Sequence, residues 1–370
     1  MVEVLRYGLI GAGMMGREHV RNLAIIPGSR ITALSDPDEG SRAEGVRAVG
    51  PDVKVFSDHR ALLESGEVDA VLIASPNDTH KAILDDVFAA PKPLAIFCEK
   101  PICTRLEDVA ALAKAATSHK APVWVGMEYR YMPPLAQLIG HVRDGTVGRL
   151  RMLTMREHRF PFLPKVADWN RFSRRTGGTL VEKCCHFFDL MRLIVQDEPV
   201  RVYASGGADV NHRDESYGGE TPDIIDNAYA VVDFRSGARA MLDLCMFADG
   251  SSWQEEIAAV GDKGKVECFI PSSKRFWPDQ TERHAEIVVS PRENKGPVRL
   301  PVDVDEQVLK AGEHHGATFF QHQKFRRAVL DGAPVEVTLE DGLRAVVIGL
   351  AAERSAAERR VVEIDGLSFR

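Results

Sequence analysis

Short apolar runs alternate with amphipathic, Ala-rich segments over the first 126 residues. The apolar runs have the length of strands and lie at 4–10, 30–35, 53–56, 70–74, 94–98 and 122–126. Helical patterns separate them at 14–24, 39–48, 58–65, 78–90 and 105–118. Strands joined by crossovers of helical length form parallel sheets with helices on both faces. Residues 1–126 are therefore predicted to form a Rossmann-type, doubly wound parallel α/β domain.

The pattern changes after residue 126. Helical patterns at 133–144 and 184–195 flank a strand pattern at 149–158 and a polar, Arg-rich stretch. Hairpin-like strands follow at 200–206, 227–234, 238–247, 255–261 and 265–269. A Pro- and charge-rich segment at 271–300 predicts loop plus one edge strand, and helices are predicted at 316–331 and 340–359. Residues 127–370 are predicted as a substrate-binding and oligomerisation α/β domain with a large open, mostly antiparallel sheet, whose last helix can pack back on the first domain.

Composition narrows the class of protein. The chain has 370 residues, 44% hydrophobic and 27% charged, with a formal net charge of −7. This favours two globular domains and argues against a nucleic-acid or membrane partner. The absence of an apolar run of about 20 residues and of a signal-peptide pattern predicts a cytoplasmic protein. Six cysteines, two of them adjacent in Cys184-Cys185-His186, suit neither a disulfide framework nor a metal cluster, so no metal is expected.

A glycine-rich turn lies between the first predicted strand and helix. Glycines at 11, 13 and 16 give the pattern G-x-G-x-x-G. The first glycine permits a tight turn, the second lets the backbone approach a pyrophosphate, and the third allows close packing of helix on strand. A glycine-rich turn without a ligand gives the same pattern, so context decides. The cofactor residues predicted in this turn are Gly11, Gly13, Met14, Met15 and Gly16.

An acidic residue and two further turns strengthen the dinucleotide interpretation. Asp36 follows the second strand, where a carboxylate can bind the adenosine ribose and would repel a 2′-phosphate, which predicts NAD over NADP. The fourth and fifth strands end in Ser75-Pro76-Asn77 and Glu99-Lys100-Pro101, at the sheet edge where such ligands bind. A helix N-cap explains Asn77 equally well, and His80 also suits a structural role. The further cofactor residues predicted are Ser75, Pro76, Asn77, His80, Glu99 and Lys100.

Two basic side chains are candidates for proton transfer. Lys100 follows an apolar strand, where nearby positive charge would lower its pKa, although an ordinary Glu–Lys surface pair is the alternative. His186 follows Gly177-Gly178 and lies four residues after Glu182, hence on one helical face with it. A carboxylate can orient an imidazole base, while a packed structural histidine is the other interpretation. The predicted catalytic residues are Lys100, His186 and Glu182.

Placement alone suggests further substrate contacts. Aromatic rings and guanidinium groups suit a polyol, and candidates of this kind follow the interdomain crossover, occupy the Arg-rich stretch and precede the penultimate helix with His314. Surface placement explains each of them as well. The predicted substrate-binding residues are Lys100, Arg130, Tyr131, Trp169, Arg171, Lys183, His186 and His315.

Together these motifs resemble the glucose–fructose oxidoreductase / inositol dehydrogenase (Gfo/Idh/MocA) family. The resemblance covers nearly the whole chain, from the glycine turn through Glu99-Lys100-Pro101 and the segment 177–189 to Ala351-Ala352-Glu353-Arg354-Ser355. It implies a nicotinamide domain, an α/β domain whose open sheet often mediates oligomerisation, and oxidation or reduction of sugars or cyclitols. It also implies catalytic roles for Lys100 and His186. Glu182 stands where the family usually has aspartate, and Lys183 where a small residue is common, so the role of Glu182 is left open.

Three functions follow as expectations. The first is an NAD-dependent dehydrogenase of a secondary alcohol on a sugar or cyclitol, acting as a homo-oligomer (a dimer or tetramer through the C-terminal sheet). The second is a non-catalytic NAD-binding regulator, because a fold alone does not define a function. The third keeps the scaffold for NAD-dependent glycoside hydrolysis or oxidation of a dihydrodiol.

Overall fold

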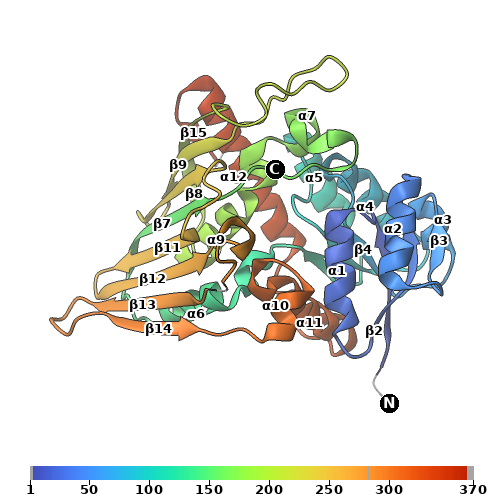
Figure 1. Ribbon diagram of the computed structural model, residues 1–370, viewed down its shortest axis with the longest axis horizontal. Coiled ribbons are helices and arrows are strands. Elements are labelled where there is room, and N and C mark those ends of the chain that lie inside the picture. The colour runs from blue at the N-terminus through green and yellow to red at the C-terminus, as the bar shows by residue number, and fades with distance from the viewer. Residues whose placement is uncertain (1–2, 282, 365–370) are drawn as a thin grey trace.

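The computed structural model describes residues 3–281 and 283–364 and contains two sheets with helices between and around them (Figure 1). The six strands of the first sheet are all parallel, in the order β3-β2-β1-β4-β5-β6. They are β1 Leu5–Ile10, β2 Ser29–Ser35, β3 Lys54–Phe56, β4 Ala70–Ile73, β5 Ala95–Cys98 and β6 Val123–Val125. Their crossover helices are α1 Met14–Ala24, α2 Glu39–Val49, α3 His59–Glu64, α4 His80–Ala89 and α5 Leu106–Ala116. This confirms the predicted doubly wound sheet, with its strand order reversing between β1 and β4.

The second sheet has nine strands in the order β14-β13-β12-β11-β7-β10-β9-β8-β15. All neighbours are antiparallel except β7 and β10, which confirms the mostly antiparallel prediction. The strands are β7 Leu150–His158, β8 Pro199–Gly207, β9 Asn227–Phe234, β10 Arg239–Cys245, β11 Trp253–Gly261, β12 Gly264–Pro271, β13 Ala285–Pro291, β14 Val298–Val302 and β15 Val362–Glu363.

The segment 271–300 differs from its prediction. It contributes the two hairpin strands β13 and β14, where one edge strand was expected. The turn between them contains Gly296, which has a positive φ of 73°. Four of the five residues of β14 are exposed, so this edge strand lacks the alternation of apolar and polar residues that reveals a half-buried strand.

Helices cover one face of the nine-stranded sheet and leave the other open (Figure 1). Along β9, Ala228, Ala230 and Val232 are buried on the covered face, while Tyr229 and Val231 are 60% and 41% exposed on the other. The helices of this half are α6 Pro133–Arg143, α7 Ser173–Thr176, α8 Thr179–Glu182, α9 Cys185–Val195, α10 Glu306–Ala311, α11 Ala317–Leu330 and α12 Leu339–Glu358. The short 3-10 turns are η1 Asn77–Thr79, η2 Glu128–Tyr131, η3 Val166–Arg171, η4 Lys274–Phe276 and η5 His314–Gly316.

The last helix connects the two sheets. A capping box of Thr338 and Asp341 begins α12, which packs against β6 and α5 on one side and against β8 and α9 on the other. The approach is close, because a Cβ on Gly342 would lie 2.9 Å from the Val125 side chain. Before the helix, Val125 N donates a 3.1 Å hydrogen bond to Val337 O. The C-terminal elements therefore complete the outer edge of the first sheet.

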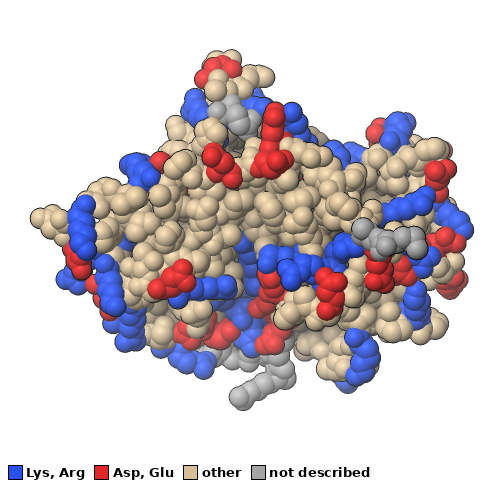
Figure 2. Space-filling model, turned by 90° about the horizontal axis from the view of Figure 1, so that it is seen from below, with Lys and Arg blue, Asp and Glu red and all other residues tan. Residues whose placement is uncertain are grey.

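Charged side chains of both signs are interspersed on the face shown in Figure 2, with apolar and uncharged surface between them. Among the described residues, no helix combines the length and apolar character needed to cross a bilayer.

Candidate active site

The glycine turn at the end of β1 has the shape that a dinucleotide requires. Gly11 has a φ of 95°, and a Cβ there would lie 2.7 Å from the backbone of Ala74 and Ser75. A Cβ on Gly16 would lie 2.2 Å from Gly11 O, whereas one on Gly13 would meet no atom within 4 Å. Gly11 and Gly16 thus allow strands and helix to approach, and Gly13 leaves space in front of the α1 N-terminus, where a pyrophosphate fits. Met14 and Met15 begin that helix.

Asp36 is fixed beside this turn. Its carboxylate accepts hydrogen bonds of 2.9 Å from Ala12 N and from Asp38 N. Each oxygen retains a further lone pair, so the carboxylate can still accept from ribose hydroxyls. Arg42, which sequence reasoning passed over, donates to the main-chain oxygens of Asp36 and Pro37 at 2.7 and 2.9 Å.

The two strand-end turns are joined by His80. Its Nδ1 lies 2.8 Å from Pro101 O and its Nε2 2.9 Å from Ser75 O, and the side chain is buried. Since backbone oxygens lie against both ring nitrogens, His80 holds the turns together, which favours its structural role; its contact with the cofactor stays a prediction. Ser75 and Pro76 lie in the turn itself, where the Ser75 hydroxyl bonds to Thr79 at 2.7 Å.

Lys100 reaches from the first sheet into the second half of the chain. It follows β5, precedes a cis peptide bond to Pro101, and donates through Nζ to Glu182 O at 2.8 Å. Burial disfavours its charge, but the carboxylates of Glu182 and Glu99 outweigh burial and raise the pKa of Lys100. This direction is opposite to the one expected from the sequence. Lys100 therefore remains a cation near neutral pH in the protein alone.

Glu99 anchors the same turn from behind. Its Oε1 lies 2.9 Å from His19 Nε2, and the other ring nitrogen of His19 lies 2.8 Å from His322 Nε2. Gly126 allows this placement, because a Cβ there would lie 2.7 Å from Glu99 Oε1. The carboxylate thus faces a buried histidine pair, which indicates that Glu99 positions the turn.

His186 is a buried imidazole stacked on Tyr129. The ring centroids are 4.1 Å apart with 6° between the planes, and His186 is 2% exposed. Its Nδ1 has no hydrogen-bond partner among the described residues. Burial, followed by the charges of Lys100 and Lys183, holds the pKa of His186 well below its ordinary value. The imidazole is therefore neutral at pH 7 and is able to accept a proton.

Glu182 does not orient His186 as the spacing suggested. Glu182 ends α8, while His186 belongs to α9, which begins at Cys185, so the two residues do not share one continuous helical face. The Glu182 carboxylate instead accepts a hydrogen bond from Asn77 Nδ2 and lies 4.0 Å from Lys165 Nζ. Asn77 is not the N-cap of α4, because this helix begins after Thr79 and has no side-chain cap. Its amide binds Glu182 instead.

Lys183 belongs to a buried cluster that sequence reasoning missed. Its Nζ lies 2.9 Å from Glu157 Oε1, and it also donates to the hydroxyl of Tyr129. Glu157 and Glu255 face each other across β7 and β11, and burial followed by the charge of Glu157 raises the pKa of Glu255 to about 7. The sequence held a signal for the burial of Glu157, because this residue continues the inward-facing series of Leu153 and Met155 on β7.

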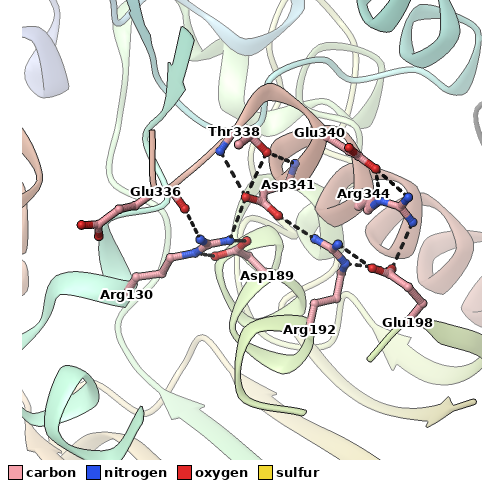
Figure 3. Close-up of polar contacts among 9 residues, drawn as sticks. All are labelled: Arg130, Asp189, Arg192, Glu198, Glu336, Thr338, Glu340, Asp341 and Arg344. Atoms are coloured by element: carbon pink, nitrogen blue, oxygen red, sulfur yellow. Dashed lines mark hydrogen bonds and ion pairs between the residues drawn. The ribbon is translucent and has the colours of Figure 1, made fainter. Parts of the chain in front are cut away.

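Arg130 takes part in a separate polar network (Figure 3), to which Tyr131 also contributes a hydrogen bond. Arg130 donates to Asp189 through Nε at 2.6 Å and to Glu336 O at 2.7 Å, and Tyr131 donates to the Glu336 carboxylate at 3.1 Å. The network continues through Asp341 to Arg192 on α9. These contacts connect η2, α9 and the start of α12 and give Arg130 and Tyr131 a structural role, while their predicted contact with substrate stays a prediction.

The remaining predicted substrate residues separate into two groups. Trp169 is buried under Lys165, whose Nζ lies 4.7 Å from the ring centroid, and thus borders the site of Glu182. Arg171 instead donates to Glu215 at 3.0 Å and supports the loop between β8 and β9.

Of the two adjacent histidines, His314 is the one that faces the candidate site. His314 Nδ1 lies 3.0 Å from Glu128 Oε1, and its ring centroid lies 5.5 Å from that of Tyr129. His315, the residue predicted from the sequence, comes next in η5, and both histidines have positive φ values. The sequence offered no means to choose between them, because the choice depends on this left-handed turn.

The carboxylate of Glu353 explains the second glycine of the adjacent pair Gly177-Gly178. Glu353 on α12 accepts a 2.7 Å hydrogen bond from Leu180 N, and a Cβ on Gly178 would lie 2.3 Å from Glu353 Oε1. Burial raises the pKa of Glu353 to about 7. Gly178 therefore gives the carboxylate access to the start of α8.

We expect Glu353→Gln to change the pH dependence of stability. The folded protein retains the Glu353 proton where the unfolded chain has lost it, so this group's contribution to stability falls as pH rises from about 4.5 to 7. The loss is about 2–3 kcal/mol. Glutamine keeps the acceptor without the charge, so the variant should lose less stability between pH 5 and pH 8 in urea unfolding. The exposed Glu340→Gln on the same helix is the control, and an equal slope in all three proteins would contradict the assignment.

The fold and the glycine turn define a Rossmann-type dinucleotide-binding protein with a second α/β domain. Two family descriptions match the chain: "Oxidoreductase family, NAD-binding Rossmann fold" over residues 5–127, and "Oxidoreductase family, C-terminal alpha/beta domain" over residues 140–364. The chain belongs to the Gfo/Idh/MocA family of oxidoreductases, as its motifs suggested.

Individual relatives extend over nearly the full length. The chain is 28% identical to a myo-inositol 2-dehydrogenase of Thermotoga maritima, over 98% of this chain and 99% of that protein. A solved putative myo-inositol dehydrogenase of Sinorhizobium meliloti superposes with a TM-score of 0.77 at 26% identity, covering 98% of this chain and all of the other. A levoglucosan dehydrogenase solved with NADH and levoglucosan has a TM-score of 0.81 at 20% identity, covering 98% and 100%, and shows a shared fold.

Proposed function

We propose that this protein catalyses NAD-dependent oxidation of a secondary alcohol on a sugar or cyclitol, or the reverse reduction. The observation that carries the proposal is the convergence of a cationic Lys100 and a neutral, buried His186 beyond the carboxyl edge of the first sheet. Lys100 is close enough for its charge to lower the pKa of His186. The similarity to inositol dehydrogenases supports this substrate class.

The roles follow from these protonation states. A neutral imidazole can accept the hydroxyl proton, and an ammonium group can stabilise the oxygen as it becomes negative. Glu182 positions the lysine through its main-chain oxygen, and Tyr129 holds the plane of the His186 ring. The nicotinamide, when bound, supplies the hydride acceptor, which leaves the protein to orient the alcohol and move the proton.

Asp36 favours NAD over NADP in this proposal. Its carboxylate is fixed by Ala12 N and Asp38 N beside the glycine turn, where it would repel a 2′-phosphate. Arg42 is engaged with the main-chain oxygens of Asp36 and Pro37. A larger kcat/KM with NADP than with NAD would contradict this preference.

A substrate panel tests the proposed function. The protein is incubated with NAD or NADP and each of a set of inositols, monosaccharides and sugar acids, and absorbance at the NADH band is followed. We expect net NADH formation with at least one compound. Hydrolysis of a glycoside without net NADH would favour the glycosidase alternative. Absence of all turnover, combined with NAD-dependent binding of a protein partner, would favour a regulator.

We also propose that the open face of the nine-stranded sheet binds a second copy of this chain. Tyr203, Val231 and Met241 lie in one row across β8, β9 and β10, and all three are exposed. Exposed apolar patches of this kind are typical of protein–protein contacts. Light scattering should therefore give a mass above 40.9 kDa, and a monomer would contradict the assignment.

A further inference from the structure

Four basic side chains lie near the site of His186 and Glu182. Lys100 donates to Glu182 O, and Lys183 donates to Tyr129, the ring stacked on His186. The segment after β7 contributes Arg159, 3.7 Å from Glu157, and Lys165, 4.0 Å from Glu182. The Arg159 side chain is 12% exposed and that of Lys165 is 20% exposed, so both charges are largely removed from solvent. Isolated cations in such surroundings are costly unless an anion compensates them.

The nearby carboxylates are shared among these cations. Lys100 and Lys165 both face Glu182. Lys183 Nζ lies 2.9 Å from Glu157 Oε1, whereas Arg159 Nη1 lies 3.7 Å from the same oxygen.

The other acidic groups neutralise less of the positive charge of these basic side chains. Glu99 is engaged by His19 at 2.9 Å. Burial, followed by neighbouring carboxylates, raises the pKa of Glu128 to about 8 and that of Glu255 to about 7, so the first is largely neutral at pH 7. Arg159 and Lys165 are therefore the cations held least closely by a carboxylate, at 3.7 Å from Glu157 Oε1 and 4.0 Å from Glu182 Oε1.

The arginine is also held in one orientation. Its Nε donates to Phe160 O at 3.1 Å, and its guanidinium carbon lies 4.3 Å from the centre of the Phe160 ring. A planar guanidinium fixed in this way matches the two oxygens of a carboxylate. Burial lowers the pKa of Lys165, and the charges of Lys100 and Arg159 lower it further, so Lys165 is within electrostatic reach of this guanidinium.

We propose that the substrate is a polyhydroxy acid, such as a uronate or an aldonate, whose carboxylate binds Arg159 with Lys165 beside it. This proposal rests on the dehydrogenase function proposed above and specifies its substrate class. In the oxidation, the C–H bond of the secondary alcohol breaks as hydride leaves for the nicotinamide of NAD. The hydroxyl proton goes to His186, a C=O bond forms, and the carboxylate is unchanged.

The test compares acids with their neutral parents in the full-length protein with NAD. The probes are D-glucuronate against D-glucose, D-galacturonate against D-galactose, and D-gluconate against D-sorbitol. We expect at least one acid to exceed its parent in kcat/KM by more than 10-fold. Arg159→Gln should lower that ratio by about 10- to 100-fold, mainly through KM, because it removes a charged hydrogen-bond donor. Arg47→Gln, on the surface of α2, is the matched control and should leave the ratio unchanged.

The outcomes separate this inference from the proposed function. Turnover of neutral polyols with equal or lower rates for every acid overturns the inference and keeps the dehydrogenase. If no compound reduces NAD, the dehydrogenase proposal fails, and thermal stabilisation of the NADH-bound protein by the acids decides the inference independently. Stabilisation that Arg159→Gln abolishes supports it, whereas no stabilisation, or stabilisation that the variant retains, overturns it.

Discussion

Replacing Lys100 by methionine is expected to lower kcat by about 100- to 10,000-fold, the range typical for loss of a proton-transfer or charge-stabilising group. The ammonium group is the cation that reaches His186 from the first sheet, and methionine retains most of its length without the charge. His186→Ala should cost a similar factor because it removes the neutral base. Steady-state rates with the best compound of the panel measure both effects.

Controls separate catalysis from folding and cofactor binding. Both variants should bind NADH as the parent protein does, as followed by its fluorescence. Lys114→Met, at an exposed position on α5, should leave both kcat and binding unchanged. Removing Lys100 leaves Glu182 with Lys165 alone, so circular dichroism and Tm are compared first. Near-normal turnover in folded Lys100→Met and His186→Ala would refute the site.

Gly13→Val is expected to abolish NAD binding, with Kd rising by at least about 100-fold, while the protein stays folded. A Cβ on residue 13 meets no protein atom within 4 Å, and the φ of Gly13 is an ordinary −67°. The space it fills is the one that a pyrophosphate would occupy, so the loss falls on binding and not on stability. Titration of NADH fluorescence and a thermal melt give the two quantities.

Two other glycines provide the contrast. A Cβ on residue 250 also meets no protein atom within 4 Å, so Gly250→Val should change neither the NADH affinity nor the stability. Gly16→Ala places a Cβ 2.2 Å from Gly11 O, so it should destabilise the fold by about 1–3 kcal/mol. Unchanged NADH affinity in Gly13→Val would show that the dinucleotide does not approach this turn.

The first half of the chain was predictable because its signals are local. All four residues of β4 and of β5 are buried, and such continuous apolar strands read clearly between amphipathic helices. The glycine turn was equally clear because its three glycines follow one another within six residues, although the steric demand on Gly11 comes from the distant Ala74 and Ser75. On the exposed edge strand β14, packing imposed no such pattern.

The details of the site depended on contacts between distant residues. The partnership of Lys100 with Glu182 spans 82 positions, and that of Arg130 with Asp189 spans 59. Glu182 and His186 are four residues apart, which would put them on one face of a continuous helix. The helix breaks between α8 and α9, so this spacing does not bring their side chains together. Lys165 and Arg159 were missed because charged residues in an Arg-rich stretch carry no mark of burial, whereas the alternation along β7 did mark Glu157.

The hydrogen bond from Val125 to Val337 and the packing of α12 on β6 mean that residues 1–126 do not cover their own sheet completely. A fragment ending at residue 126 would keep all six parallel strands yet expose the flank of β6 and the apolar surface that α12 covers. Such a fragment should self-associate or precipitate. During synthesis, the outer edge of the first sheet therefore stays uncovered until α12 has been made and packs against it.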